Sequence, residues 1–233
     1  MELRPFFKYF GSKWRVAPKY PAPVHTKLIE PFAGSAGYAT RYPSLDVTLC
    51  DLDPTICGVW DYLIKVKPSE LMALPDLKKG ESTLDLVLPT EAKDLIGFWF
   101  MSGAASPGRT PSTWVLGGTH PTCFWGDTIR RRLASQVHHI RHWRVRNCSY
   151  SDLVPSQVAT WFVDPPYVHH GKHYRKSSKD MNFASLADWC RALQGQAMVC
   201  EGAGADWLPF EPITIVPARA NKAASIEYVW VNT

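Results

Sequence analysis

The order of apolar and polar positions in the first third of the chain predicts strands that alternate with helices. The run 27–32 predicts a strand, and the run 47–50 predicts a second one. Between them, the small residues 33–37 predict a turn that leads into a short helix ending near Tyr42. Apolar residues then recur at helical spacing from Ile56 onwards. This order of elements is typical of the first half of a doubly wound α/β sheet.

The pattern weakens between residues 67 and 126, where prolines and glycines are frequent and one helix is predicted at 90–101. Order returns at Asp127, which we expect to cap a helix, and a later amphipathic helix is expected to close at Gly195. The last two strand-like runs are expected to form an antiparallel edge. The strands predicted in this part of the chain are 143–148, 161–163, 197–200, 213–216 and 226–231.

Length and composition fit one globular domain, or one domain with a sizeable insertion. The 233 residues are 45% apolar, enough for a full core, and the net charge of +5 mildly favours an anionic partner. No apolar stretch reaches the ~18 residues of a membrane span, and we expect no signal peptide. The six cysteines include no CxxC pair and indicate reduced thiols, so we expect a cytoplasmic protein.

One four-residue segment, Asp164-Pro165-Pro166-Tyr167, follows the buried run 161–163 directly. The two prolines fix φ and remove two backbone donors, so the loop that they begin is stiff. The loop presents a carboxylate and an aromatic ring where open α/β sheets bind their ligands. A carboxylate can accept hydrogen bonds from an amino group, and the ring can stack on a planar base. The same four residues also fit a rigid turn without a function, so the choice between the two interpretations depends on other segments of the chain.

A second site is predicted at the small-residue turn after Phe32. Its glycines allow a ligand to approach the backbone closely, and the segment that follows offers a helix N-terminus. The spacing G-x-G-x-x-G is absent, which disfavours a dinucleotide. Asp51 ends the next strand, where such folds hydrogen-bond ribose hydroxyls. A nucleoside-bearing cofactor beside an amine-binding loop suggests group transfer to an amine.

Five segments resemble, in order, motifs of the Dam-type DNA adenine-N6 methyltransferases. Residues 9–13 resemble the N-terminal cofactor motif of that family, 30–37 its glycine motif and 51–53 its ribose motif. Residues 150–152 resemble a loop near the cofactor, and 164–167 are similar to the catalytic D-P-P-Y. The order resembles the alpha group, which carries its target-recognition region in the middle, and the layout resembles phage and prophage members.

The resemblance implies a Rossmann-like methyltransferase fold with S-adenosylmethionine as cofactor. It assigns 1–66 and 147–233 to the catalytic domain, and 67–146 to an inserted candidate recognition region whose last helix packs back on the core. Ser12 and Asp53 depart mildly from the usual motifs. The cofactor-binding residues implied are Tyr9, Lys13, Glu30, Phe32, Gly34, Asp51, Leu52, Tyr150, Asp152 and Asp164.

The implied reaction transfers a methyl group to the N6 amine of an adenine that has been flipped out of double-stranded DNA. Asp164 and the carbonyl of Pro165 accept hydrogen bonds from the amine, which favours a nitrogen able to attack the methyl group. Tyr167 stacks on the base, and Pro166 completes the catalytic motif.

Basic residues near these motifs are candidates for contact with nucleic acid. Lys172, Arg175 and Lys176 directly follow the catalytic loop, and Arg109 lies in the insertion. Several histidines lie within 169–173, but they have no carboxylate or cysteine partners at ligand spacing, so we expect no metal. Methylation can be specific to one sequence or promiscuous, since the insertion matches no known recognition region.

Other functions stay open at this point. An RNA adenine methyltransferase would use the same chemistry at the base. A catalytically silent nucleic-acid-binding protein is disfavoured by the intact motifs, and a nicotinamide-dependent oxidoreductase by the missing glycine pattern. Cytosine-N4 enzymes more often carry serine or threonine in place of Asp164.

Overall fold

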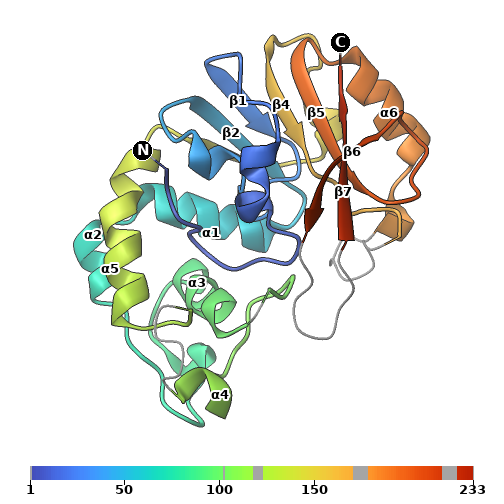
Figure 1. Cartoon of the computed structure of the whole chain (residues 1–233). Coiled ribbons are helices and arrows are strands. Elements are labelled where there is room, and N and C mark those ends of the chain that lie inside the picture. Colours follow the sequence, from blue (N-terminus) through green and yellow to red (C-terminus); the bar gives the residue numbers. More distant parts are fainter. Residues whose placement is uncertain (1, 102, 118–122, 170–177, 217–224, 233) are drawn as a thin grey trace.

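The computed structural model describes residues 2–101, 103–117, 123–169, 178–216 and 225–232 (Figure 1). Seven strands form one sheet in the order β3-β2-β1-β4-β5-β7-β6. The first five strands are parallel, whereas β7 is antiparallel to both β5 and β6. The strands are β1 (Lys27–Glu30), β2 (Asp46–Asp51), β3 (Arg144–Asn147), β4 (Ala159–Val163), β5 (Gly195–Gly202), β6 (Glu211–Val216) and β7 (Ser225–Val231).

This topology confirms the fold class predicted from the sequence, a Rossmann-like, doubly wound sheet with an antiparallel edge at its C-terminal side. The order reverses between β1 and β4, which is the switch point where ligands bind in folds of this type. The predicted catalytic loop leaves the sheet at that point, directly after β4.

Two hydrophobic cores cover the two faces of the sheet because side chains alternate along each strand. Phe162 packs into the core that contains helix α1 (Pro54–Lys65), while Trp161 and Val163 pack into the core that contains α6 (Phe183–Ala192). All three side chains are buried. The end of β4 is therefore fixed from both sides, and so is the start of the loop that follows.

The segment between β2 and β3 after α1 is mainly helical. It contains α2 (Pro68–Met72), α3 (Thr90–Phe100), α4 (Thr113–Leu116) and α5 (Asp127–Gln136), and α5 packs against α2. Phe98 of α3 stacks on Phe7 within the core of the main domain, with ring centroids 5.0 Å apart. The predicted boundary at residues 146/147 falls inside β3. The assignment of 67–146 to target recognition stays a prediction.

Three local predictions were wrong in detail. The expected helix ending near Tyr42 is only a 3₁₀ turn, Ala39–Arg41, because the preceding turn places Gly34 and Ala36 at positive φ. Gly126, rather than Asp127, is the N-cap of α5, and the Asp127 carboxylate instead pairs with Arg131.

The third correction concerns Gly195, which was expected to close α6 but begins β5. Leu193 is the C-cap of α6, and Gly195 has φ +93°. A Cβ atom at position 195 would lie 2.3 Å from the carbonyl oxygen of Ala159, so glycine is required for the two strands to start side by side. Within the described residues, no helix is both long and apolar enough to cross a membrane.

Candidate functional site

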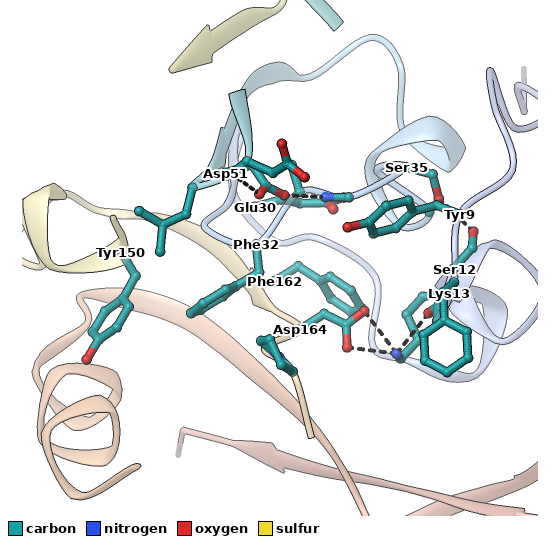
Figure 2. Close-up of a pocket in the computed structure, with 18 of the residues that line it drawn as sticks. Tyr9, Ser12, Lys13, Glu30, Phe32, Ser35, Asp51, Tyr150, Phe162 and Asp164 are labelled. Carbon is teal, nitrogen blue, oxygen red and sulfur yellow. Dashed lines mark hydrogen bonds and ion pairs between the residues drawn. The ribbon is translucent and has the colours of Figure 1, made fainter. Parts of the chain in front are cut away.

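A cavity of about 420 Å³ lies at the carboxyl ends of β1, β2 and β4. Figure 2 shows Asp51 at one end, the Lys13–Asp164 pair at the other, and the rings of Phe32 and Phe162 between them. The structure thus brings together residues as distant in the chain as Tyr9 and Ser185. The predicted site residues that line the cavity are Tyr9, Lys13, Glu30, Phe32, Gly34, Asp51, Leu52, Tyr150, Asp164 and Pro166.

The glycine turn after β1 lets the N-terminal segment approach the sheet closely. A Cβ atom on Gly37 would lie 2.5 Å from the backbone nitrogen of Trp14, and one on Gly34 would lie 3.0 Å from the Tyr9 ring. Gly34 has φ +45°, a conformation that side chains disfavour. The turn therefore holds Tyr9 and Lys13 at the cavity, as the sequence motifs led us to expect.

Asp51 closes one end of the cavity and is held by the backbone. Its carboxylate accepts hydrogen bonds from the backbone N–H groups of Gly34 and Asp53, both at 2.9 Å. Burial raises the pKa of Asp51 to about 6, while these N–H groups oppose the rise by stabilising the charged form. Asp51 is therefore mostly ionised at neutral pH and fixed in position.

Glu30, at the end of β1, has a more buried carboxyl group. It accepts a hydrogen bond of 2.6 Å from the backbone N–H of Ala39. Burial raises the pKa of Glu30 to about 8, so this group is mainly protonated at neutral pH. Glu30 therefore joins the turn to the sheet without adding a full charge to the cavity.

Asp164 lies at the opposite end and is paired with a side chain. The Lys13 ammonium lies 2.7 Å and 2.9 Å from its two carboxylate oxygens, and it also donates to the carbonyl of Gly11 at 3.2 Å. The Asp164 side chain is 18% exposed. Burial raises the pKa of Asp164 to about 6, and the nearby Lys13 charge limits that rise.

Tyr167 lies behind this ion pair and not on the cavity wall. Its hydroxyl group donates a hydrogen bond to the carboxylate of Glu227 on β7, and the Lys13 ammonium lies 4.7 Å from the centre of its ring. Burial raises the pKa of the Tyr167 hydroxyl well above its ordinary value, so the group stays protonated. Two members of the catalytic loop, Asp164 and Pro166, are among the described residues that line the cavity.

Two predicted residues have other contacts in the structure. Asp152 is exposed and caps the 3₁₀ turn Tyr150–Asp152 by accepting a hydrogen bond from the backbone N–H of Ser149, and it is not among the described residues that line the cavity. Arg109 forms an ion pair of 2.6 Å with the buried Asp94, which leaves its side chain 42% exposed. Lys172, Arg175 and Lys176 lie outside the described residues.

Some residues of the site escaped the sequence analysis. Met181, Asn182 and Ser185, at and just before the start of α6, also line the cavity. They follow no motif, and nothing in the local pattern marks them. Across the part of the chain that the structure describes, no three His, Cys, Asp or Glu side chains form a group that could hold a metal ion.

The sequence matches no protein-family model and no curated protein. Among solved structures, the rRNA methyltransferase AviRa from Streptomyces viridochromogenes is similar at 13% identity, with a TM-score of 0.40 over 97% of this chain and 86% of that chain. A conserved hypothetical protein from Streptococcus pyogenes is similar at 11% identity, with a TM-score of 0.36 over 95% of this chain and 92% of that chain. At these TM-scores the likeness does not bear on what this chain does.

Proposed function

We propose that the protein is an S-adenosylmethionine-dependent methyltransferase that modifies the N6 amine of adenine in DNA. The observation that carries this proposal is a single cavity that reaches from Asp51 to Asp164. One end fits a ribose, because Asp51 has a fixed carboxylate at the end of β2. The other end fits an amine, because Asp164 has an acceptor within reach of the cavity.

The charges of the cavity favour a cationic ligand. The described lining residues include the carboxylates of Asp51, Asp53 and Asp164 and the ammonium of Lys13, while Glu30 is mainly protonated and adds no full charge. S-adenosylmethionine carries a sulfonium, an ammonium and one carboxylate, so its net charge is positive. The pyrophosphate of a nicotinamide dinucleotide is anionic and would be repelled by these carboxylates. The electrostatics thus support the first cofactor over the second.

The reaction follows from the groups at the Asp164 end. Asp164 and the carbonyl of Pro165 accept hydrogen bonds from the adenine amine and hold the nitrogen in line with the methyl group. Formation of the N–CH₃ bond would break the bond between the methyl carbon and the sulfonium sulfur and release a neutral thioether, and the nitrogen would then lose one proton to solvent. The Asp164 carboxylate would stabilise the positive charge that the nitrogen gains before that proton leaves. Stacking of the base on the Tyr167 ring is carried over from the resemblance, since Tyr167 is not among the described residues that line the cavity. The adenine must leave the helix to reach this point.

The choice of adenine in DNA rests on the resemblance of the five motifs to Dam-type enzymes, and RNA is the alternative substrate. We also propose that residues 67–146 contribute to target recognition, because they form a helical segment that joins the same core as the N-terminal cofactor motif. The positions of the modified bases will show whether this segment reads sequence.

Transfer of tritiated methyl groups tests the proposal. Purified protein is incubated with labelled S-adenosylmethionine and unmethylated double-stranded DNA, single-stranded DNA or RNA, and the product is digested to nucleosides. We expect label in N6-methyldeoxyadenosine, and none with Asp164→Ala. Asp188→Ala is the matched control, since Asp188 is an exposed surface residue paired with Arg191. Label in RNA alone would move the substrate to RNA, and absence of label from every nucleic acid would contradict the proposal.

A further inference from the structure

Glu227 is a charged residue at a core-facing position of the antiparallel edge. Along β7 it shares a face with Val229, which packs into the same core as Phe162. Glu227 is 7% exposed, and an apolar residue would be expected at such a position. A buried carboxylate is unfavourable unless hydrogen bonds and charges compensate for its lost hydration. The identity of its partners therefore indicates why the residue is there.

Two of the described partners of Glu227, Tyr167 and Lys13, belong to the predicted reaction centre. The Glu227 carboxylate accepts hydrogen bonds from the hydroxyl groups of Tyr167 and Tyr20, the latter at 2.6 Å. The same oxygen lies 3.7 Å from the Lys13 ammonium. Glu227 thus contacts one residue of the catalytic loop and the ammonium that pairs with Asp164, although no sequence motif connects it to either.

We propose that Glu227 is a positioning residue of this centre, which fixes the ring of Tyr167 and shares the Lys13 ammonium with Asp164. This inference rests on the function proposed above. The hydrogen bond anchors the far end of the Tyr167 side chain, so the ring keeps one orientation for stacking. Such positioning is effective because small displacements of reacting groups slow a reaction strongly.

The sharing of Lys13 also has a consequence for the substrate. In the structure the ammonium is 2.7 Å from Asp164 and 3.7 Å from Glu227. When an amine donates to Asp164, the ammonium can shift toward Glu227 and stay compensated. Asp164 is then available as an acceptor without leaving a buried unpaired charge.

Glu227 also acts on the titration of Asp164, because two buried negative charges disfavour each other. Its removal is expected to lower the pKa of Asp164. The ionisable groups that interact with Asp164 or lie in the same cluster are Lys13, Tyr20, Glu30, Tyr167, Cys200, Glu201 and Glu227. Glu227→Gln removes one charge from this cluster while keeping the shape of the side chain and one acceptor oxygen.

The test compares Glu227→Gln with the wild type and with Tyr20→Phe. The matched control Tyr20→Phe removes one hydrogen bond to the same carboxylate but keeps the charge and the bond to Tyr167. Three quantities are measured: kcat for methyl transfer, the Kd for the cofactor by calorimetric titration, and the pKa of Asp164 by carbon-13 NMR of labelled aspartate, assigned with Asp164→Asn. For Glu227→Gln we expect kcat to fall about 10- to 100-fold, the pKa of Asp164 to fall, and the cofactor Kd to stay at the wild-type value. Tyr20→Phe keeps the Glu227 charge and its bond to Tyr167, so its kcat and its Asp164 pKa are both expected to change less than in Glu227→Gln.

A wild-type kcat or an unchanged Asp164 pKa in folded Glu227→Gln would overturn the inference. If that variant does not fold, Tyr167→Phe tests the same hydrogen bond from its other end, and an unchanged kcat would be equally contradictory. If the wild type methylates no nucleic acid, the proposed function fails, and the NMR titration alone then decides the role of Glu227, because it needs no substrate.

Discussion

Asp51 and Asp164 stand at the two ends of one cavity and have similar environments, but they are held in different ways. Burial raises the pKa of both carboxyl groups to about 6. The backbone N–H groups of Gly34 and Asp53 fix Asp51, whereas the flexible side chain of Lys13 holds Asp164. Both lie at the carboxyl ends of parallel strands of the same sheet, so the difference lies in the segments that reach them: the glycine turn after β1 for Asp51 and the N-terminal segment with Lys13 for Asp164.

This contrast separates binding from reaction. A carboxylate fixed by backbone donors keeps its geometry whether or not a ligand is present, which suits a group that holds a ribose. A carboxylate paired with a lysine can exchange that partner for a substrate amine. The Asp51 end is thus expected to determine affinity for the cofactor, and the Asp164 end to determine the rate of transfer.

The largest effect is expected from Asp164→Asn. The amide keeps the size of the side chain but removes the negative charge that stabilises the nitrogen in the transition state. We expect methyl transfer to fall about 10³-fold, with the Kd for S-adenosylmethionine close to the wild-type value. Single-turnover rates and calorimetric titration of the same preparation measure the two quantities. A weakened Kd with a normal rate would reverse the roles of the two ends.

Asp51→Ala is expected to have a smaller effect, and to change the Kd for the cofactor more than the transfer rate. Loss of the hydrogen bonds to the ribose should weaken the Kd for S-adenosylmethionine about 10- to 100-fold, and the transfer rate at saturating cofactor should change much less. Asp51→Asn is the control, since it retains the side-chain volume. Because Asp51 also ties β2 to the glycine turn, thermal unfolding of each variant is measured beside the titration.

The smallest effect is a pH shift caused by Lys13→Met. The Lys13 charge lowers the pKa of Asp164, so its removal raises that pKa further above 6. If the ionised form of Asp164 is the active one, activity is lost as the pH falls through its pKa, and the acid limb of the rate profile moves to higher pH. Lys13→Arg keeps the charge and should leave the limb near its wild-type position. An acid limb that does not move in Lys13→Met would argue against Asp164 as the titrating group.

Much of this site could be predicted from the sequence because its parts follow strands. Parallel strands place their carboxyl ends together, so Asp51 and the loop 164–167 were expected to be neighbours once the strands were recognised. The contact that Asp152 makes follows from local spacing. Ser149 and Asp152 have the spacing of a capping box, and this local signal, not the resemblance, corresponds to the contact observed.

The remaining contacts depend on tertiary structure alone. Glu227 is 214 residues from Lys13 in the chain, and the apolar run around it predicted only an edge strand. Arg109 gave the signal of an exposed basic residue, but its partner Asp94 is buried on α3 and could not be identified from spacing. Packing of α6 against the sheet brings Asn182 to the cavity, and no periodic pattern in the sequence predicts that position.

Calorimetric titration of the wild-type protein with S-adenosylmethionine and then with NAD tests most directly what occupies the cavity between Asp51 and Asp164. The structure leads us to expect one molecule of S-adenosylmethionine per chain and no binding of NAD, because the carboxyl groups of the cavity favour a cation over a pyrophosphate. Binding of NAD without binding of S-adenosylmethionine would contradict both the cofactor and the reaction proposed here.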